Sequence, residues 1–351
     1  MSSPSLPLSV RDAIEDIQND HESGARQLAI KALHALQLAF ETYNYSSFSS
    51  GDDDRSKWMN IVTCARHISQ SRPSMRAAIH TAVLRALHTI QQGSDPKQTI
   101  ADLIHDEETA LSTLCQHYVE SILQLSTPQS STVSILTLSN SSTIFAAFKT
   151  LFSHPKCPNI ILTILESRPL CEGATLATNL LPYISTSKHA KVMIQLATDA
   201  SAAFFAKQSD VVVFGADQLD PHTGCVKNKI GSLAVATFGH TYGKKVVCVA
   251  ATDKLEVRED DEEIEENDEK EVVDGLPGAV AKGWESVLVK LGGDEVDGIG
   301  VHGLRVRNVY FEWVPAEFVE GYVTELGYLG KNDLNEIYVE REAWRDVWNG
   351  E

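Results

Sequence analysis

The stretch Val211-Val212-Val213-Phe214-Gly215-Ala216-Asp217 decides the fold class of this chain. Four consecutive apolar residues end in a Gly-Ala turn and a carboxylate, a pattern typical of a buried strand. Similar apolar runs lie at 133–138, 160–165, 191–196 and 246–250, with helical patterns between them at 142–152, 172–181, 199–207 and 229–242. This alternation predicts a parallel sheet with helices on both faces, an α/β domain of the doubly wound kind.

The sequence changes character near residue 128. Before it, apolar residues recur at helical spacing within 28–40, 77–90 and 100–125, and residues 46–54 form a predicted loop. A stretch rich in Ser, Thr and Pro at 126–132 is the predicted linker. We therefore expect two domains, an all-helical domain at 1–127 and the α/β domain at 128–351. The closing segment from 306 is expected to hold a short strand, a helix after Pro315 and an aromatic tail.

The composition is that of a globular protein, with 43% hydrophobic and 22% charged residues among 351. A net charge of −18 argues against direct binding of nucleic acid. No run approaches the ~18 apolar residues of a membrane helix, and the N-terminus lacks the features of a secretory signal. The six cysteines have no CxxC spacing, so we expect reduced thiols and a cytoplasmic protein.

Half of the net charge comes from one run, because residues 259–271 include ten acidic residues and a single lysine. Blocks of like charge are usually solvated. We therefore expect a disordered acidic insertion in the α/β domain at about 256–274. A plain surface insertion is the simpler interpretation, and a contact with a basic partner is the alternative.

Polar residues follow the carboxyl ends of four predicted strands. They are Ser139-Asn140-Ser141-Ser142-Thr143, Glu166-Ser167-Arg168-Pro169, Gly215-Ala216-Asp217 and Ala251-Thr252-Asp253-Lys254. In a parallel sheet these ends share one edge, where ligands bind. Two cations, two carboxylates and a hydroxyl-rich loop at a helix N-terminus suit a phosphorylated polyol, with the cations on phosphate and the aspartate on a hydroxyl or proton.

Each of these residues also has a purely structural interpretation. The serine cluster could serve only as a helix cap. Arg168 could pair with Glu166 or Glu172, and Asp217 could serve only a turn. Asn228-Lys229 is read as the start of a helix, where a lysine opposes the helix dipole and so favours a phosphate ligand.

Several site classes have no support in the sequence. The histidines show no HxH or HxxxH spacing, so no metal site is expected. No GxGxxG, Walker A, GxSxG or HExxH motif occurs, and we expect no cofactor.

The motifs together resemble a known family. It joins the alpha, beta and delta regulatory subunits of translation initiation factor 2B to two isomerases, which act on 5-methylthioribose-1-phosphate and ribose-1,5-bisphosphate. The resemblance covers nearly the whole chain, in order. Its motifs are Ser23-Gly24-Ala25, Ser71-Arg72-Pro73-Ser74, Ile135-Leu136-Thr137, Glu166-Ser167-Arg168-Pro169 with Glu172-Gly173, Val211 to Asp217, Gly224 to Ser232 with Asn228-Lys229-Ile230-Gly231, Val247 to Ala250 with Lys254, Glu312-Trp313-Val314-Pro315 and Thr324-Glu325-Leu326-Gly327.

The resemblance implies a helical N-terminal domain, a Rossmann-like C-terminal domain that dimerises, and a sugar-phosphate pocket between the domains. The residues expected to bind the ligand are Gly24, Ala25, Arg72, Ser141, Ser142, Arg168, Asn228, Lys229 and Lys254. Asp217 and Ser139 stand at the family's catalytic positions. The isomerases carry a cysteine where this chain has Ser139, and a hydroxyl is a far weaker acid than a thiol, whose pKa is about 8.5.

These residues support two main hypotheses. The preferred one is a regulatory-subunit-like protein of translation initiation, which binds a phosphorylated small molecule without turnover and forms a homodimer or a hetero-oligomer with related subunits. The alternative is an aldose–ketose isomerase of a pentose phosphate, in which Asp217 moves a proton and Ser139 polarises a carbonyl. In a third hypothesis the pocket is vestigial and the acidic insertion contacts a basic partner.

Overall fold

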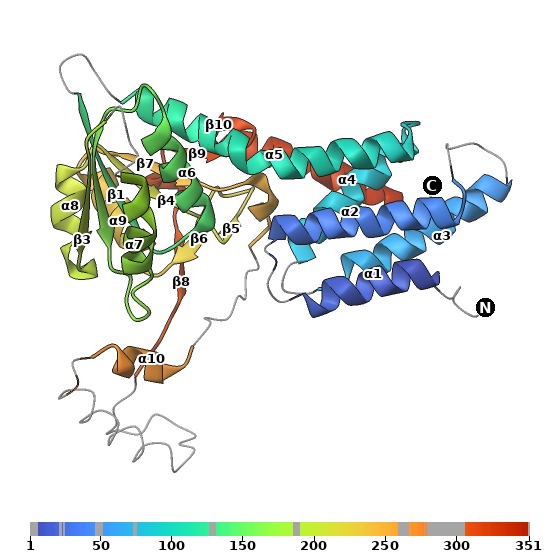
Figure 1. Ribbon diagram of the computed structural model, residues 1–351, viewed down its shortest axis with the longest axis horizontal. Helices are drawn as coiled ribbons and strands as arrows, with labels where there is room; N and C mark the ends of the chain where they lie inside the picture. Colours follow the sequence, from blue (N-terminus) through green and yellow to red (C-terminus); the bar gives the residue numbers. More distant parts are fainter. Residues whose placement is uncertain are drawn as a thin grey trace, which may run out of the picture. The chain divides into compact units, whose positions relative to one another are not determined.

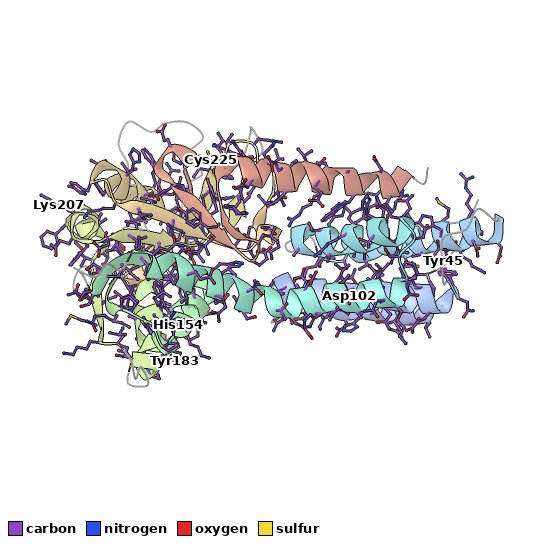
Figure 2. The ribbon with its side chains drawn as sticks, turned by 90° about the horizontal axis from the view of Figure 1, so that it is seen from above. Tyr45, Asp102, His154, Tyr183, Lys207 and Cys225 are labelled. Atoms are coloured by element: carbon purple, nitrogen blue, oxygen red, sulfur yellow. The ribbon has the colours of Figure 1, made fainter. Side chains whose placement is uncertain are left out.

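The computed structural model describes residues 6–20, 23, 25–45, 52–72, 76–125, 131–184, 190–258, 267–276, 278 and 306–349 (Figure 1). Two compact units make up the chain. The helical unit comprises Met1–Leu114, Ala251–Glu256 and Asn332–Glu351. The α/β unit comprises Cys115–Ala250 and Val257–Lys331. Figure 2 labels Tyr45 and Asp102 in the helical unit, and His154, Tyr183, Lys207 and Cys225 in the α/β unit.

Amphipathic helices build the helical unit. Their apolar faces meet in one core that includes Leu33, Ile61, Ile79 and Leu87, all fully buried. The helices are α1 Leu8–Asn19, α2 Ala25–Thr42, α3 Asp52–Ser69, α4 Arg76–Gln91 and α5 Pro96–Leu123. The predicted loop at 46–54 is too long by its last three residues, because Asp52–Asp54 form the first turn of α3 and Lys57 pairs with Asp53 there. Residues 46–51 lie outside the described residues.

The end of the chain returns to the helical unit. Helix α12 (Lys331–Ala343) leads into the short helix η5 (Trp344–Asn349), and Val347 is fully buried in the core of α1–α5. Arg66 donates a hydrogen bond to the carbonyl oxygen of Trp348. The α/β unit in turn begins at Cys115, within α5, and the predicted linker lies partly outside the described residues. The predicted domain limits remain a prediction.

A seven-stranded sheet forms the α/β unit, in the order β10-β9-β7-β4-β1-β2-β3. All neighbouring pairs are parallel except β9 with β10. The five apolar runs of the sequence form β1, β2, β3, β4 and β7, which confirms the predicted fold class. The strands are β1 Thr132–Leu138, β2 Asn159–Leu165, β3 Val192–Ala197, β4 Val211–Phe214, β7 Lys245–Val249, β9 Gly321–Thr324 and β10 Gly327–Leu329.

Four helices cover the sheet in two layers. Helix α6 contacts α7, and α8 contacts α9. Right-handed crossovers on the two sides of β1 place these pairs on opposite faces. The helices are α6 Ser142–Ser153, α7 Glu172–Ile184, α8 Ala202–Gln208 after the short helix η2 Asp199–Ser201, and α9 Ser232–Thr241.

A second, three-stranded antiparallel sheet corrects one prediction. Its order is β5-β6-β8, with β5 at Gln218–Leu219, β6 at Val226–Lys229 and β8 at Phe311–Val314. Asn228 and Lys229 pair with Glu312 and Phe311 in this sheet, so they do not start a helix. Helix α9 begins at Ser232, after Gly231 with a φ of 102°.

The closing segment also contains more strands than expected. The predicted strand is β8, but the helix expected after Pro315 is only the short turn η4 (Ala316–Phe318). β9 and β10 follow it as the edge of the large sheet. Their position depends on β7, which lies far away in the sequence, so local patterns could not reveal it.

Part of the acidic insertion is ordered, contrary to expectation. Helix α10 spans Glu269–Asp274 and is capped by Asp268, whose side chain accepts the Lys270 N–H. Glu271 accepts hydrogen bonds from Asn308 and Tyr310, and Val273 is buried. These contacts hold the helix despite its charge. Residues 259–266, the most acidic part, lie outside the described residues.

No helix of the described residues combines the length and the apolar character that crossing a membrane requires. The predicted cytoplasmic location is not tested by this finding.

Candidate functional site

The strand order of the large sheet contains one topological switch point. From β1 the chain first builds outward through β2 and β3, and then returns to add β4 on the other side of β1. Loops that leave neighbouring strands in opposite directions open a crevice at the carboxyl ends of those strands. The two loops here begin at Ser139, after β1, and at Gly215, after β4. The fold therefore favours this position for a ligand.

The loop after β1 holds the serine cluster. Ser139 adopts a φ of 64°, and its N–H donates to the hydroxyl of Ser167 at 2.7 Å. Ser141 is the N-cap of α6, and its hydroxyl accepts the N–H of Ile144 at 3.4 Å. Ser141 thus caps α6, while Ser142 is the first residue of that helix. A side chain at Gly215 would lie 3.4 Å from the Ser141 hydroxyl, so the loops after β1 and β4 are in close contact.

The loop after β2 is fixed by a carboxylate from the next loop. Asp199 accepts the N–H of Ser167 and the N–H of Arg168, each at 2.8 Å. Ser167 has a φ of 59° and is buried, and Cys171 has a φ of 53°. The peptide bond between Arg168 and Pro169 is cis. This loop orders the backbone of Ser139, because the Ser167 hydroxyl binds it.

Asp217 follows β4 at the switch point. Its N–H donates to the carbonyl oxygen of Lys227 at 2.9 Å, which starts the β5–β6 hairpin, so the predicted turn role is present. Burial, and secondarily the charge of Asp217, raise the pKa of the fully buried Cys248 thiol at the end of β7. The electrostatic influence of Asp217 thus reaches the carboxyl end of β7.

Lys229 lies in a strand beside a carboxylate, and not at the start of a helix as predicted. Its Nζ lies 3.0 Å from the carboxylate of Glu172, the first residue of α7, and 4.1 Å from the ring centroid of Tyr310. The lysine is 8% exposed. The argument from the helix dipole is wrong, because Lys229 lies in β6. A phosphate would instead have to compete with Glu172 for this cation.

Asn228 supports the local structure beside Lys229. Its amide donates to the Ser232 hydroxyl at 2.8 Å, and that hydroxyl donates to the Lys229 carbonyl oxygen at 2.7 Å. Glu312 accepts the N–H groups of Gly231 and Leu233, at 2.6 and 2.9 Å. The N-terminus of α9 therefore already has an anionic partner.

Arg168 and the end of the acidic insertion lie close together. A side chain at Gly275 would be 2.8 Å from Nη2 of Arg168. Burial, together with Glu271, raises the pKa of Tyr310 to about 12, so this hydroxyl stays protonated and donates to Glu271. Of the two carboxylates suggested for Arg168, Glu172 pairs with Lys229 instead. Arg168 and Lys229 thus both lie near the α10 region, Arg168 beside Gly275 and Lys229 beside Tyr310, which binds Glu271 of α10.

The remaining predicted residues belong to the helical unit. Lys254 ends the short helix η3 (Thr252–Lys254), which packs against α4, and Thr252 of η3 accepts two hydrogen bonds from Arg341. Nη1 of Arg72 is buried and has no hydrogen-bond partner. Ala25 begins α2, and Gly24 lies outside the described residues. The roles predicted for these four residues stay predictions.

Two residues that shape the site were missed in the sequence. Asp199 holds the loop of Arg168, and Ser167 holds that of Ser139. Ser167 stood within a quoted motif, but only its neighbour Arg168 had an evident chemical role. Asp199 stands at the start of a predicted helix, where an acidic residue is common. Nothing in the sequence therefore indicated that its carboxylate binds the backbone of another loop.

No cluster of three or more His, Cys, Asp or Glu residues in the described part of the chain could hold a metal ion.

Comparison with known proteins identifies the family. The model of the family described as "Initiation factor 2 subunit family" matches residues 21–331. The chain belongs to this family. This family membership confirms the resemblance seen in the motifs, from Ser23-Gly24-Ala25 to the closing segment.

Relatives in this family carry two kinds of name. Ribose 1,5-bisphosphate isomerase of Thermococcus kodakarensis is 24% identical over 345 residues, which are 95% of each chain. The "putative translation initiation factor eIF-2B subunit 2-like" protein of Pyrococcus furiosus is 26% identical, over 92% of this chain and 96% of the relative. The relatives of this chain thus include proteins named as enzymes and proteins named as initiation-factor subunits.

Solved structures of the family share the fold. The eIF2B beta structure from Chaetomium thermophilum has a TM-score of 0.60 at 13% identity, covering 98% of this chain and 93% of that one. The tetrameric eIF2B-beta2-delta2 complex from C. thermophilum has a TM-score of 0.56 at 14% identity, covering 96% and 95%. Both confirm a helical N-terminal region followed by an α/β region.

Proposed function

We propose that this chain is an aldose–ketose isomerase of a phosphorylated pentose. One observation carries the proposal: the hydroxyl-bearing loop after β1 and the loop of Asp217 after β4 meet at the switch point, where Gly215 approaches Ser141. The isomerase names among relatives that match nearly the whole chain support it. They reverse the order of the two hypotheses drawn from the sequence, where Ser139 favoured the regulatory one.

The proposed isomerisation requires only groups that transfer a proton or donate a hydrogen bond. Isomerisation of a cyclic pentose 1-phosphate moves the hydrogen on C2 to C1, and the C2 hydroxyl becomes a carbonyl while its proton passes to the ring oxygen. The atoms balance within the substrate, so no cofactor is consumed. Asp217 takes the proton of the C2 hydroxyl as a general base, a role worth about 10²–10⁴ in rate. Ser139 donates a hydrogen bond to the developing carbonyl.

Two cations of the α/β unit are proposed to hold phosphate. Lys229 is buried and paired with Glu172, so a phosphate that displaces this carboxylate gains a desolvated, charge-assisted contact. The backbone of Arg168, from which its guanidinium would reach the phosphate, is held by Asp199, which accepts its N–H. Ser142 lies in the first turn of α6, where N–H groups attract anions.

Phosphorus NMR tests the proposal directly. The purified chain is mixed with ribose-1,5-bisphosphate, and in a second sample with 5-methylthioribose-1-phosphate. Turnover converts the C1 phosphate from a group next to one hydrogen into one next to two, so its doublet becomes a triplet. Substrate that stays unchanged for hours, with the protein folded and both sugars tried, would overturn the proposal.

A thiol variant sharpens the test. Ser139→Cys should raise turnover by about tenfold or more, because a thiol, unlike the Ser139 hydroxyl, can relay the proton to the ring oxygen as its bond to C1 breaks. Ser153→Cys is the matched control, since Ser153 lies at the other end of α6 and its hydroxyl only bonds back to Lys149. Equal turnover in both variants would exclude a role for position 139 in proton transfer.

The second candidate function is a regulatory subunit that binds the sugar phosphate without turnover. It is favoured by Ser139 at the position of the family cysteine and by the eIF-2B-like name of one relative. The same spectra distinguish it, because shifted or broadened substrate signals without a new triplet indicate binding alone. In this case the chain would act in translation initiation through a second copy or related subunits, and size-exclusion chromatography with light scattering would show the assembly.

A further inference from the structure

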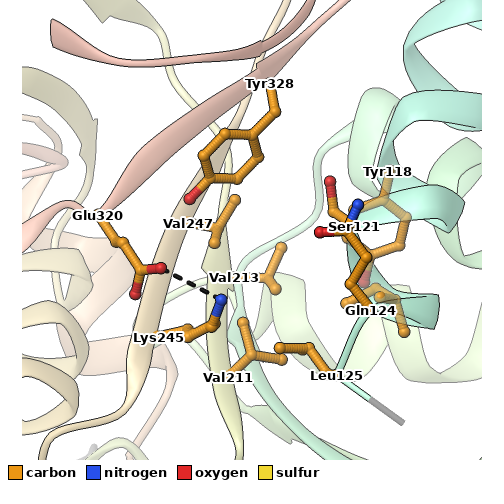
Figure 3. Close-up of a pocket in the computed structure, with 11 residues that line it drawn as sticks. Tyr118, Ser121, Gln124, Leu125, Val211, Val213, Lys245, Val247, Glu320 and Tyr328 are labelled. Carbon is orange, nitrogen blue, oxygen red and sulfur yellow. Dashed lines mark ion pairs between the residues drawn. The ribbon is translucent and has the colours of Figure 1, made fainter.

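A cavity of about 130 Å³ lies in the α/β unit away from the proposed active site (Figure 3). Val211 and Lys245, which line it, are the first residues of β4 and β7. The proposed active site lies at the opposite ends of the same strands, about 13 Å away at 3.3 Å per residue. Residues of the α5 region, of β4 and β7, and Glu320 and Tyr328 line the cavity.

One side of the cavity is apolar. Val211, Val213 and Val247 of the sheet line this side together with Ile122 and Leu125 of the α5 region, and the three valines are buried. An apolar cavity of about 150 Å³ in another protein holds one benzene molecule. The space here thus fits a single six-membered ring, and its valine wall suits a flat apolar face.

The opposite side is polar. Nζ of Lys245 lies 3.3 Å from Oε1 of Glu320, and about half of each side chain is exposed, so the pair stands where the cavity meets solvent. Figure 3 shows Tyr328 beside this pair, across the cavity from Tyr118, Ser121 and Gln124. A side chain at position 321 would collide with the Tyr328 ring at 2.3 Å, so Gly321 makes room for the phenol.

The polar groups offer both donors and acceptors without a net charge. Burial and the Glu320 carboxylate raise the pKa of Tyr328, so its hydroxyl remains a donor. Lys245 keeps N–H donors beyond the one directed at Glu320, and Glu320 keeps acceptor positions. A ligand hydroxyl or amide can therefore donate to Glu320 and accept from Lys245 at once. A phosphate or carboxylate would face Glu320 at close range, which disfavours an anion.

The wall contributed by α5 is firmly held. The ring of His117 binds the carbonyl oxygen of Thr324 in β9 through Nδ1 at 2.9 Å, and Tyr118 packs edge-on against Phe148 of α6. The hydroxyl of Tyr118 is buried and lacks a hydrogen-bond partner. The cavity is therefore preformed, as ligand pockets usually are.

We propose that this cavity binds a small uncharged ring that carries one hydroxyl or amide group, of the size of a phenol. The ring lies on Val211, Val213 and Val247, and the polar group bridges Lys245 and Glu320. This site is independent of the proposed isomerase reaction, since it shares no residue with the carboxyl ends of β1 and β4.

The test uses 4-fluorophenol as a probe in ligand-observed fluorine NMR with the full chain. Fluorobenzene and 4-fluorobenzoate serve as comparison probes that lack the hydroxyl or carry a charge. We expect the 4-fluorophenol signal to broaden, with at least fivefold weaker binding of the other two. Absence of broadening with 4-fluorophenol at millimolar concentration, or equal binding of the benzoate, would overturn the proposal.

Two variants locate the binding. Ser121→Phe places a ring into the cavity and should abolish broadening, whereas Ser112→Phe, at an exposed site of the same helix, should leave it unchanged. Both serine hydroxyls only bond back to their own helix, at His117 and Thr109. Glu320→Gln replaces a half-exposed carboxylate and should weaken 4-fluorophenol without changing fluorobenzene. Undiminished binding in a folded Ser121→Phe or Glu320→Gln protein would exclude this cavity.

Discussion

The two ends of the parallel strands in the large sheet differ in how their loops are held. We call the side where these strands end the carboxyl edge, and the side where they begin the amino edge. Three of the four non-glycine residues with positive φ in the described part of the chain follow the carboxyl ends of β1 and β2, namely Ser139, Ser167 and Cys171. At the amino edge, no described non-glycine residue has a positive φ, and side chains hold the backbone through hydrogen bonds. There Asp210 accepts the Ser134 N–H at 2.8 Å, and Asn159 accepts the Lys191 N–H at 3.0 Å.

This difference shows that the fold accepts unfavourable backbone conformations at the carboxyl edge. Non-glycine residues in the left-handed region cost about 1 kcal/mol or more each and persist only where the surroundings enforce them. The Asp199 carboxylate and the Ser167 hydroxyl supply that enforcement at the carboxyl edge. The ties at the amino edge only join neighbouring strands. Matched changes at the two edges should therefore have unequal effects.

The largest difference is expected between the two aspartates that flank β4. Asp217→Asn should lower turnover by about 10³, or about 4 kcal/mol, because the general base is lost while substrate still binds. Asp210→Asn, at the other end of the strand, should leave turnover within twofold. Steady-state kinetics with binding measured by calorimetry checks both. Full activity of the Asp217 variant would contradict the proposed mechanism.

Two glycines give the next largest difference, now in stability. A side chain at Gly173 would lie 1.8 Å from the Leu165 carbonyl oxygen, where α7 starts against β2. Gly173→Ala should cost about 3 kcal/mol, because backbone must move. Gly243, before β7, has a φ of 64° and open space around it, so Gly243→Ala should cost only about 1 kcal/mol of strain. Urea unfolding measures both, and equal costs would refute the contrast.

A smaller effect is expected for two buried serines. Ser167→Ala leaves the Ser139 N–H without its partner and should cost about 2 kcal/mol of unfolding free energy. Ser209→Ala, before β4, removes only a hydroxyl bonded to the Ala206 carbonyl, at about 1 kcal/mol. The Ser167 variant alone should also weaken phosphate-ester binding in calorimetric titration. Loss of binding in the Ser209 variant as well would show a general effect of destabilisation.

The smallest expected effect concerns the reactivity of two cysteine thiols, with no change in stability or turnover. Burial raises the pKa of Cys157, at the amino edge, to about 11. Its alkylation by iodoacetamide should rise about tenfold per pH unit between pH 8 and 10, because only the thiolate reacts. Cys171, in the partly exposed carboxyl-edge loop, should react before the buried Cys157 at pH 8. Mass spectrometry of labelled peptides checks the order, with Cys171→Ser as the control for assignment.

Sequence patterns predicted the parts of the fold that depend on local periodicity. The apolar runs around Val133, Ile160 and Val211 gave the sheet, and their ends gave Ser139 and Asp217. The patterns failed where a partner far along the chain decides the outcome. Asn228 and Lys229 form a strand only because β8, more than eighty residues later, pairs with them. The Asp199 clamp was missed for the same reason, since its targets lie on another loop.

The burial of Val347 bears on how the chain folds during synthesis. The core of α1–α5 has a place for a residue that lies more than 230 positions beyond Leu114. At 5–20 residues per second, the ribosome needs on the order of 10 to 50 s to deliver it. During that interval the helical unit waits with an open apolar position. Its final packing therefore follows the synthesis of the α/β unit, most of which lies between Leu114 and Asn332 in the chain.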